Sequence, residues 1–398
     1  MSRLLIVALS LISTESKLPE SLEFRRIGAA ELRSELRPLL RSSYISTPDD
    51  SLRLDYTIAD LNWMLDTPDA DEALRVGIGV SNQPDGLVAF VCAVPSSLRL
   101  HGELHAAVEV SLLCVKRDWR GRGLTKLLLF ELRRRAKVAG VHCAVFTEAR
   151  PKYTLPLLRA DCFHRPLQPM ALLRCGFWQA PFTPAGDAKT RRRLRAAVRA
   201  AAHLPQPAML SPLAASLPPS SLRRMRQSDA KSCHQMLRDR SSHFAVAPEF
   251  TAEQFRHRFL GSGAASFVLA GKQRGEPLLG FASFTILPLR TATGQRLLQA
   301  QLLGFALAPS LAAADDALRD AALVTLLDGM LRRARAHGAH VFNALALAEL
   351  TPALLQQLGF GRGDEASYVC LDAAGGPALS IAKHAPLDPA DACWLPVL

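Results

Sequence analysis

Three sequence motifs occur twice in this chain in the same order, and this repeat constrains the fold more than any other feature. Each pair of motifs is separated by roughly 180 to 200 residues. The pairs are Gly86–Pro95 with Gly280–Pro288, Leu132–Gly140 with Met330–Gly338, and Met170–Phe177 with Leu354–Phe360. Repetition at a long, constant offset is typical of two copies of one structural unit. The chain is therefore predicted to fold as a tandem pair.

The first copy contains a strand, a basic loop and a helix in succession. Val108–Val115 is an apolar, β-branched run of strand length, and from Leu124 to Ala136 apolar residues recur at helical spacing. The loop between them carries Lys116, Arg117, Arg120, Gly121, Arg122 and Gly123. A helix that starts after such a loop offers free N–H groups and a positive dipole end, which suit a phosphate group. The alternative is a solvated basic turn in an ordinary α/β protein.

The second copy lacks this loop. Gly304–Asp316 carries acidic residues where the first copy carries arginine. The sequence therefore predicts that only the first half binds a phosphorylated molecule. Neither half has the Gly-Lys-Ser/Thr of a P-loop or the third glycine of a dinucleotide fingerprint.

Composition narrows the class of protein. The 398 residues are 49% hydrophobic and 21% charged, which indicates a globular chain of two domains. A net charge of +12 favours anionic partners, but one phosphorylated ligand accounts for a basic patch, so no nucleic-acid partner is expected. Eight cysteines without a Cys-x-x-Cys pair favour reduced thiols over disulfides or zinc, hence no metal and a cytoplasmic location.

Four segments are expected along the chain. They are an extension at 1–17, a first unit at 18–182, a basic helix and linker at 183–220, and a second unit at 221–398. The apolar run near the start resembles a signal peptide and is too short to span a bilayer; a buried strand or an upstream extension is the alternative. Apolar spacing predicts helices at 19–44 and 58–65, and strands at 74–80, 87–94 and 141–146.

The loop resembles the pyrophosphate loop of the GNAT fold, and the surrounding motifs resemble one family, the glycylpeptide N-myristoyltransferases. The motifs are Leu52–Tyr56, Val108–Gly140, Ala144–Thr147, His164–Leu167, Val341–Leu345 and Leu358–Asp364. This resemblance implies an α/β fold of two tandem GNAT-like units related by a pseudo-two-fold axis. Each unit would be a mixed, mostly antiparallel sheet flanked by helices.

The resemblance also implies an activity, the transfer of myristate from myristoyl-CoA to the N-terminal glycine of acceptor proteins. It assigns the oxyanion hole to the backbone amides of Leu112 and Leu113, and a contact with the glycine amine to Thr147. The proton would pass to the α-carboxylate of Leu398. The CoA phosphates would be held by Lys116, Arg117, Arg120, Gly121, Arg122, Gly123, Leu124 and Thr125. Myristoyl-CoA is then a co-substrate, with no permanently bound cofactor.

Residues that match the family's peptide groove lie in both halves. They are Tyr44, Asp49, Asp50, Ser111, His164, Asn343, Gly363 and Asp364. Ser111 replaces a family asparagine, and Gln301–Phe305 replaces a tyrosine-rich strand. These departures leave two alternatives open: an N-acyltransferase with another acyl-CoA or amine, and an inactive homologue that binds acyl-CoA or peptide. A monomer without integral membrane segments is expected.

Overall fold

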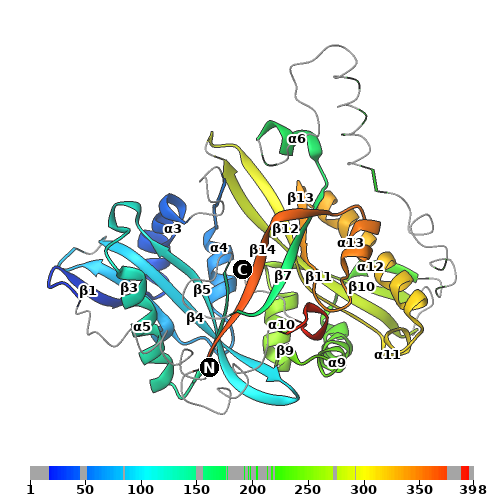
Figure 1. Ribbon diagram of the computed structural model, residues 1–398, viewed down its shortest axis with the longest axis horizontal. Helices are drawn as coiled ribbons and strands as arrows, with labels where there is room; N and C mark the ends of the chain where they lie inside the picture. Colours follow the sequence, from blue (N-terminus) through cyan, green and yellow to red (C-terminus); the bar gives the residue numbers. More distant parts are fainter. Residues whose placement is uncertain are drawn as a thin grey trace, which may run out of the picture. The chain divides into compact units, whose positions relative to one another are not determined.

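The computed structural model describes residues 18–44, 52–83, 86–148, 156–175, 220–271, 276–291, 293–373 and 387–393, with a few single positions between 177 and 217. The chain divides into two compact units (Figure 1). The first comprises Met1–Ala160, Ala245–Phe250 and Ala366–Leu398, and the second Asp161–Phe244 and Thr251–Glu365. The compact units thus differ from a division of the chain into two consecutive halves, because each contains strands from both halves of the sequence.

The sheet of the first unit has the strand order β1-β3-β4-β5-β6-β14, and β9 pairs with β4. Its pairs are antiparallel except β5 with β6. The strands of this sheet are β1 Leu22–Arg26, β3 Arg75–Val80, β4 Leu87–Leu100, β5 Glu103–Val115, β6 Cys143–Glu148, β9 Val246–Glu249 and β14 Gly361–Ala373. The first unit also contains β2 Leu52–Leu54, which pairs with none of these strands. The helices are α2 Ala29–Glu31, η1 Leu32–Leu36, α3 Arg37–Ser43, α4 Ile58–Leu65, η2 Glu72–Leu74, η3 Arg117–Trp119, α5 Leu124–Val138 and η7 Pro389–Asp391.

The sheet of the second unit has the order β7-β13-β12-β11-β10-β8, and β12 with β13 is its parallel pair. The strands are β7 Pro156–Pro166, β8 Ser220–Arg224, β10 Ala264–Gly271, β11 Leu278–Thr291, β12 Arg296–Leu307 and β13 Val341–Leu345. The helices are α6 Pro169–Arg174, η5 Gln227–Asp229, α9 Ala230–Ser241, α10 Ala252–Leu260, α11 Pro309–Ala312, α12 Asp316–Ala336 and α13 Pro352–Gln357. Each unit therefore contains a long antiparallel hairpin, a helix and a parallel strand in succession, as the sequence repeat predicts.

Helix α5 covers one face of the first sheet. Leu124, Leu128, Leu132 and Ala136 repeat every four residues, are buried, and pack in one cluster with residues of β3 and β4 such as Ile78. The helix ends where Gly140 takes a φ of +76°, and the Val141 amide donates to the Ala136 carbonyl. This glycine stop recurs in the second unit at the end of α12. The repeated Leu/Met…Ala…Gly motif is thus a repeated helix ending.

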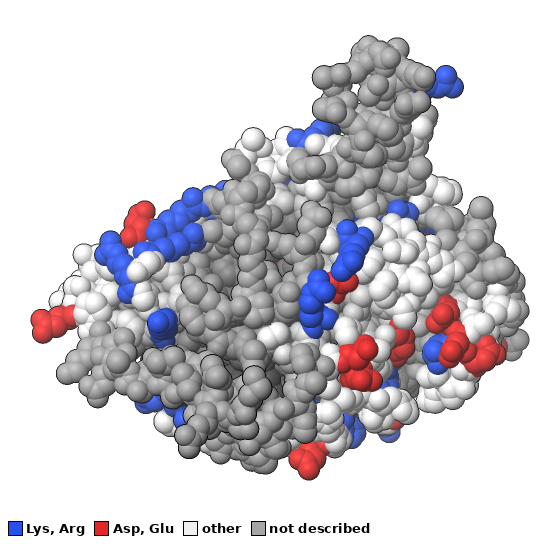
Figure 2. Space-filling view, in the orientation of Figure 1, with Lys and Arg blue, Asp and Glu red and all other residues white. Residues whose placement is uncertain are grey.

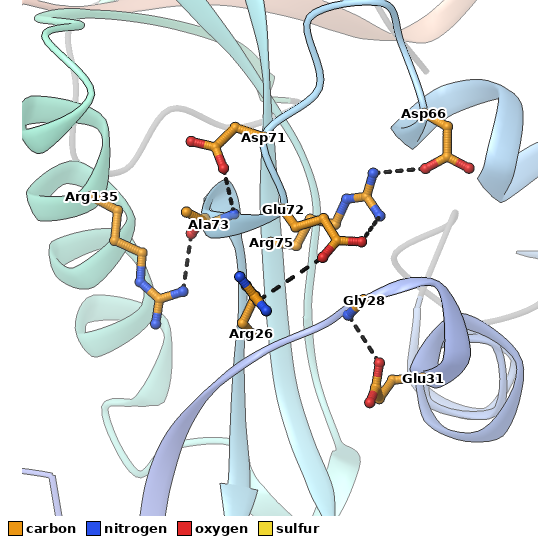
Figure 3. Close-up of polar contacts among 9 residues, drawn as sticks. All are labelled: Arg26, Gly28, Glu31, Asp66, Asp71, Glu72, Ala73, Arg75 and Arg135. Carbon is orange, nitrogen blue, oxygen red and sulfur yellow. Dashed lines mark hydrogen bonds and ion pairs between the residues drawn. The ribbon is translucent and has the colours of Figure 1, made fainter.

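Arg75, at the start of β3, makes polar contacts with neighbouring elements of the first unit (Figure 3). Its side chain is 4% exposed, and Nη2 donates to Asp66 at 2.7 Å and to the Leu65 carbonyl at 2.8 Å, at the end of α4. Nη1 lies 3.7 Å from Glu72. Arg135 of α5 donates to the Ala73 carbonyl at 3.0 Å. These contacts link α4, η2, β3 and α5, with α5 to the left and α4 to the right of β3 in Figure 3.

The core of the second unit is rich in phenylalanine. Phe267, Phe284, Phe342 and Phe360 are buried and make ring contacts with centroids 5.8 to 6.2 Å apart. Edge-to-face and offset packing of this kind adds to the free energy gained from burial alone. This cluster fixes the sheet against α12 and α13.

The structure differs from the predicted elements at three places, the smallest being the strand predicted at 141–146, which is β6 at Cys143–Glu148. Residues 19–44 are not helical throughout, because Leu22–Arg26 forms β1, in which Leu22 is buried and its neighbour Glu23 is exposed. The strand predicted at 87–94 continues to Leu100 and turns at His101 and Gly102, whose φ values are +47° and +88°. Two residues with positive φ between paired strands make a tight hairpin. Helix α4 matches its predicted bounds.

Candidate active site

Strands β5 and β6 pair over a short distance and then part. Their parallel ladder joins Ala107 to Cys143 and ends with Glu109 and Val145. Further on, β5 keeps its antiparallel partner β4, while β6 pairs with β14. Beyond Glu109 and Val145, the described ladders pair no residue of β5 with a residue of β6. The parting of two strands at their carboxyl ends leaves backbone groups available to a ligand.

A β-bulge lies on β5 just after this point. Ser111 pairs with Cys92 and Cys114 with Phe90, so that Leu112 and Leu113 together oppose a single residue of β4. Leu112 has a φ of +53° and its side chain is 1% exposed. A bulky residue rarely takes this left-handed conformation, because Cβ then crowds the following carbonyl. Strained, unpaired backbone of this kind occurs preferentially at functional sites.

The loop after β5 leaves the start of α5 open. Gly121 and Gly123 have φ values of +78° and +79°, and no atom lies within 4 Å of where a Cβ would stand at either position. Gly123 is the N-cap and supplies no side-chain hydrogen bond to the helix. The first N–H groups of α5, including those of Leu124 and Thr125, therefore lack a side-chain cap in the described structure. Uncapped N–H groups at the positive end of a helix dipole are the arrangement that suits an anion.

The basic side chains of the loop have different tasks. Arg120 is directed to the protein backbone: Nε donates to the Val115 carbonyl at 3.2 Å and Nη2 donates to the Ser43 carbonyl of α3. Arg122 lies over the Trp119 ring at 4.6 Å. Figure 2 shows Lys and Arg gathered at the upper left, on the α3 side of the first unit. Arg120 thus shapes the loop, and its pairing with Ser43 could not be read from the sequence.

A buried polar group lies beneath the bulge. The thiol of Cys92 is 3.3 Å from the Ser111 hydroxyl and donates to the Ser111 carbonyl at 3.4 Å. The ring centroid of Tyr44 is 6.4 Å from that of Tyr56. The Cys114 and Cys92 thiols are close enough to Tyr44 to influence the pKa of its hydroxyl group. Burial, assisted by these thiols, raises the pKa of Tyr44 to about 12. Both Tyr44 and Ser111 therefore adjoin the bulge, together with Cys92, which sequence reasoning missed.

Thr147 stands on β6, two residues beyond the last pair with β5. It is exposed, and its backbone pairs with Val369 of β14. Leu113, 37% exposed, lies four residues beyond the same point on β5. Two of the expected catalytic positions, Leu113 and Thr147, therefore follow the point where the strands part, one on each strand.

Three of the expected peptide-groove residues meet in the second unit. His164 and Asn343 are paired across β7 and β13, and Nδ1 of His164 lies 2.8 Å from Oδ1 of Asn343. A Cβ at Gly363 would stand 2.5 Å from Nε2 of His164 and 3.3 Å from the Cys162 carbonyl. Glycine is thus required for steric reasons, and the imidazole is fixed from two sides.

Other expected site residues fall outside the described part of the chain. These are Asp49, Asp50 and Leu398, and the side chain of Asp364 on β14. The described chain closes at Cys393, whose amide donates to the Val246 carbonyl of β9 at 2.8 Å.

No group of three or more His, Cys, Asp or Glu in the described ranges has an arrangement that could hold a metal ion. The seven cysteines whose side chains are described are free thiols, five of them buried. Among the helices described, none has both the length and the apolar character needed to cross a membrane.

Comparison with known proteins identifies the family. Residues 9–162 match the model of the myristoyl-CoA:protein N-myristoyltransferase N-terminal domain, and residues 203–368 that of its C-terminal domain. Glycylpeptide N-tetradecanoyltransferase of Aspergillus fumigatus is 28% identical over 342 residues, and glycylpeptide N-tetradecanoyltransferase 2 of Danio rerio 28% over 345. The alignments cover 83% and 85% of this chain but 64% and 63% of the relatives, so the chain spans less than two thirds of their length.

The fold is that of a solved relative. A crystal structure of Saccharomyces cerevisiae N-myristoyltransferase with bound myristoyl-CoA superimposes with a TM-score of 0.76 at 24% identity, covering 92% of this chain and 82% of that one. The predicted architecture, two mixed and mostly antiparallel sheets with helices, is confirmed. The family inferred from the motifs is confirmed as well, and the chain belongs to the N-myristoyltransferase family.

Proposed function

We propose that this protein transfers myristate from myristoyl-CoA to the N-terminal glycine amine of peptides or proteins. One observation carries the proposal: the strained bulge at Leu112 and Leu113 lies where β5 leaves β6. Strand β5 is followed by the basic loop and then by the uncapped start of α5, and both are proposed to bind the CoA phosphates. The family relationship supports the choice of acyl group and acceptor.

The proposed reaction is a direct displacement. The glycine nitrogen attacks the thioester carbonyl, a C–N bond forms, and the carbonyl oxygen becomes an oxyanion held by the Leu112 and Leu113 amides. The intermediate collapses, the C–S bond breaks and CoA leaves as a thiolate. Amides fixed in a rigid bulge suit this task, because they are oriented before charge develops.

Two further groups complete the proposal. Thr147 is proposed to contact the attacking amine, and the α-carboxylate of Leu398 to accept its proton. The demand on the base is small, because an α-amine is roughly one tenth neutral at pH 7. Adding one residue after Leu398 would move the carboxylate, so we expect slower transfer with unchanged acyl-CoA binding.

The acceptor peptide is proposed to contact His164, Asn343 and Gly363. In the second unit the imidazole of His164 lies within hydrogen-bond distance of Asn343. On its other side the ring packs closely against the backbone of Gly363, where a side chain would not fit. A fixed imidazole can read a polar group near the start of the peptide. Tyr44, Asp49, Asp50, Ser111 and Asp364 remain proposed peptide contacts.

The test combines transfer with a backbone change. Labelled myristoyl-CoA is incubated with peptides that start with Gly and with the same peptides blocked by acetylation. Replacing Leu113 by its α-hydroxy analogue makes an ester that removes one N–H and keeps the side chain. Loss of one oxyanion donor lowers kcat by about 100- to 1000-fold. The control is Leu113→Ala, which keeps the amide and changes only a partly exposed side chain.

Each outcome has a meaning. Transfer to free but not acetylated peptides, lost with the ester and kept in Leu113→Ala, supports the proposal. A preference for acetyl-CoA would favour an N-acyltransferase of another specificity. Tight myristoyl-CoA binding without turnover on any peptide would identify a binding protein. The free thiols fit a reducing compartment, and we propose that the protein acts in the cytoplasm as a monomer.

A further inference from the structure

The second unit repeats the parting of strands seen in the first. Strands β12 and β13 are parallel and pair only up to Gln301 and Asn343. A bulge follows on β12, because the register against β11 shifts at Leu303. Phe305 lies four residues beyond the last pair, as Leu113 lies four residues beyond Glu109. The position equivalent to the first unit's proposed acyl-CoA site is therefore the carboxyl end of β12.

A pocket of about 390 Å³ lies at this position. Its apolar walls come from Phe244, Phe305, Leu307, Ala313 and Leu323. The volume falls within the range of small-molecule sites, which are mostly apolar with a few polar groups. All of the lining residues belong to the second unit.

The entrance chemistry excludes a phosphate. Asp315 caps α12 and accepts the Leu318 amide at 2.8 Å, so the helix start is occupied by a carboxylate. Pro309 has no N–H to offer at the start of α11. In Figure 2, Asp and Glu gather on the right, over the part of the second unit that carries α12. A dianion would be repelled here, in contrast to the basic loop of the first unit.

One wall is rigid and electrically neutral. Arg240 is 7% exposed at its side chain, its Nε donates to Oε1 of Glu349 at 3.0 Å, and its Nη2 contacts Oε2 of the same carboxylate. The guanidinium also lies over the Phe305 ring at 4.1 Å. A two-point ion pair stacked on a ring holds its geometry, and it leaves no net charge for a ligand.

A second arginine supplies the positive charge of the pocket. Arg319 lines the pocket with a side chain that is 31% exposed, and its Nη2 donates to Asp316, a side chain that is 88% exposed. An ion pair with so exposed a partner is weak, so the guanidinium can exchange this carboxylate for one on a ligand. One accessible guanidinium next to acidic neighbours matches a single carboxylate.

We propose that this pocket binds a small apolar monocarboxylic acid, its chain against Phe305, Leu307 and Leu323 and its carboxylate at Arg319. The site is separate from the acyl-CoA site of the proposed function and does not depend on it. Duplication has kept the strand geometry in the second unit, while the sequence has replaced a phosphate-binding entrance with one suited to a single negative charge.

Calorimetric titration with sodium decanoate tests the proposal, on the full chain saturated with myristoyl-CoA. We expect one-to-one binding that decanol does not reproduce. Arg319→Met keeps the aliphatic stem and removes the charge, and should weaken binding by about 10- to 100-fold. Ala313→Trp, at an exposed position in the pocket wall, should abolish binding by filling the space. The matched control is Arg296→Met, an exposed arginine at the start of β12.

Four results would overturn the proposal, and three of them concern affinity. These three are an absence of heat at millimolar decanoate in a chain that unfolds cooperatively, equal affinity for decanol, and unchanged affinity in Arg319→Met. Decanoate that binds only without myristoyl-CoA would lie in the acyl-CoA site and would overturn it as well. Thermal unfolding of each variant separates loss of the pocket from loss of the fold.

Discussion

Leu112 combines a buried side chain with a left-handed backbone, and these two properties have opposite energetic signs. Burial of a leucine contributes about 2 kcal/mol, while the positive φ costs about 1 to 2 kcal/mol. The side chain thus holds in place a backbone that would otherwise relax. Residue preferences favour an ordinary strand at this position, so the sequence motif identified the place but not the bulge.

The thiols under the bulge should be unreactive in the folded protein. Burial raises the pKa of Cys92 to about 11 and that of Cys114 to about 12. At pH 8 both are neutral, and a neutral thiol is a poor nucleophile. We expect iodoacetamide to label the partly exposed Cys175 first, and the two buried cysteines only in denaturant. Mass spectrometry of digests measures this, and rapid labelling of Cys92 at pH 8 would contradict it.

The same shift makes stability depend on pH. The pKa of Cys92 is 9.0 without burial and about 11 in the folded state. Because the folded value is higher, the contribution to stability is complete below pH 9 and is lost as the pH rises towards 11. The free energy of unfolding should therefore fall over this window. Cys92→Ala should flatten the decline in urea titrations, and an unchanged slope would reject this assignment.

At the scale of elements, the loop before α5 depends on backbone freedom. Gly123→Ala meets no atom within 4 Å, so its cost is the positive φ alone, about 1 kcal/mol of stability. Restricted backbone here should also turn the α5 amides away from the CoA phosphates and weaken acyl-CoA binding. The control is Gly361→Ala, which also has open space but no positive φ. Fluorescence titration with myristoyl-CoA measures the affinity of both variants. An equal loss of affinity in Gly123→Ala and Gly361→Ala would refute the role given to the positive φ of Gly123.

The sequence predicted elements better than their connections. Apolar spacing located α4 and α5, because each has a regular buried face and clear ends. It missed β1, which is short and alternates only over five residues. It also could not predict that Arg120 reaches the Ser43 carbonyl, since that contact joins positions far apart in the chain. His164, Asn343 and Gly363 were named from motifs, and only the strand register brings them together.

Arg75 is a second element-scale test. Arg75→Met would leave the Leu65 carbonyl and Asp66 without their donor, at a buried junction of α4 and β3. We expect a loss of about 2 to 3 kcal/mol, less than for a fully buried pair because Asp66 is half exposed. Denaturant unfolding measures this. Arg134→Met, an exposed residue on α5, is the control.

At the scale of the molecule, each compact unit contains strands from the other half of the sequence. Residues Ala245–Phe250 and Ala366–Leu398 belong to the first unit, where β9 pairs with β4 and β14 with β6. Motif order predicted two units, but their membership depends on pairings between distant segments, which local patterns do not encode.

This exchange predicts that the first half does not fold alone. A fragment of residues 18–182 lacks β14 and leaves the β6 edge unpaired, so we expect no cooperative thermal transition. The same fragment joined through a flexible linker to residues 366–393 should regain one. Circular dichroism follows both, and a sharp transition in the shorter fragment would contradict the prediction.

The late position of β14 in the chain also matters during synthesis. The ribosome makes β1 to β6 first, yet the strand that completes their sheet follows more than two hundred residues later. The nascent first unit must wait with an open edge while the second unit is translated, and domains in this state are prone to misassembly. Chaperones that shield exposed strand edges should therefore engage this protein on the ribosome, and its yield should depend on translation speed through the second half.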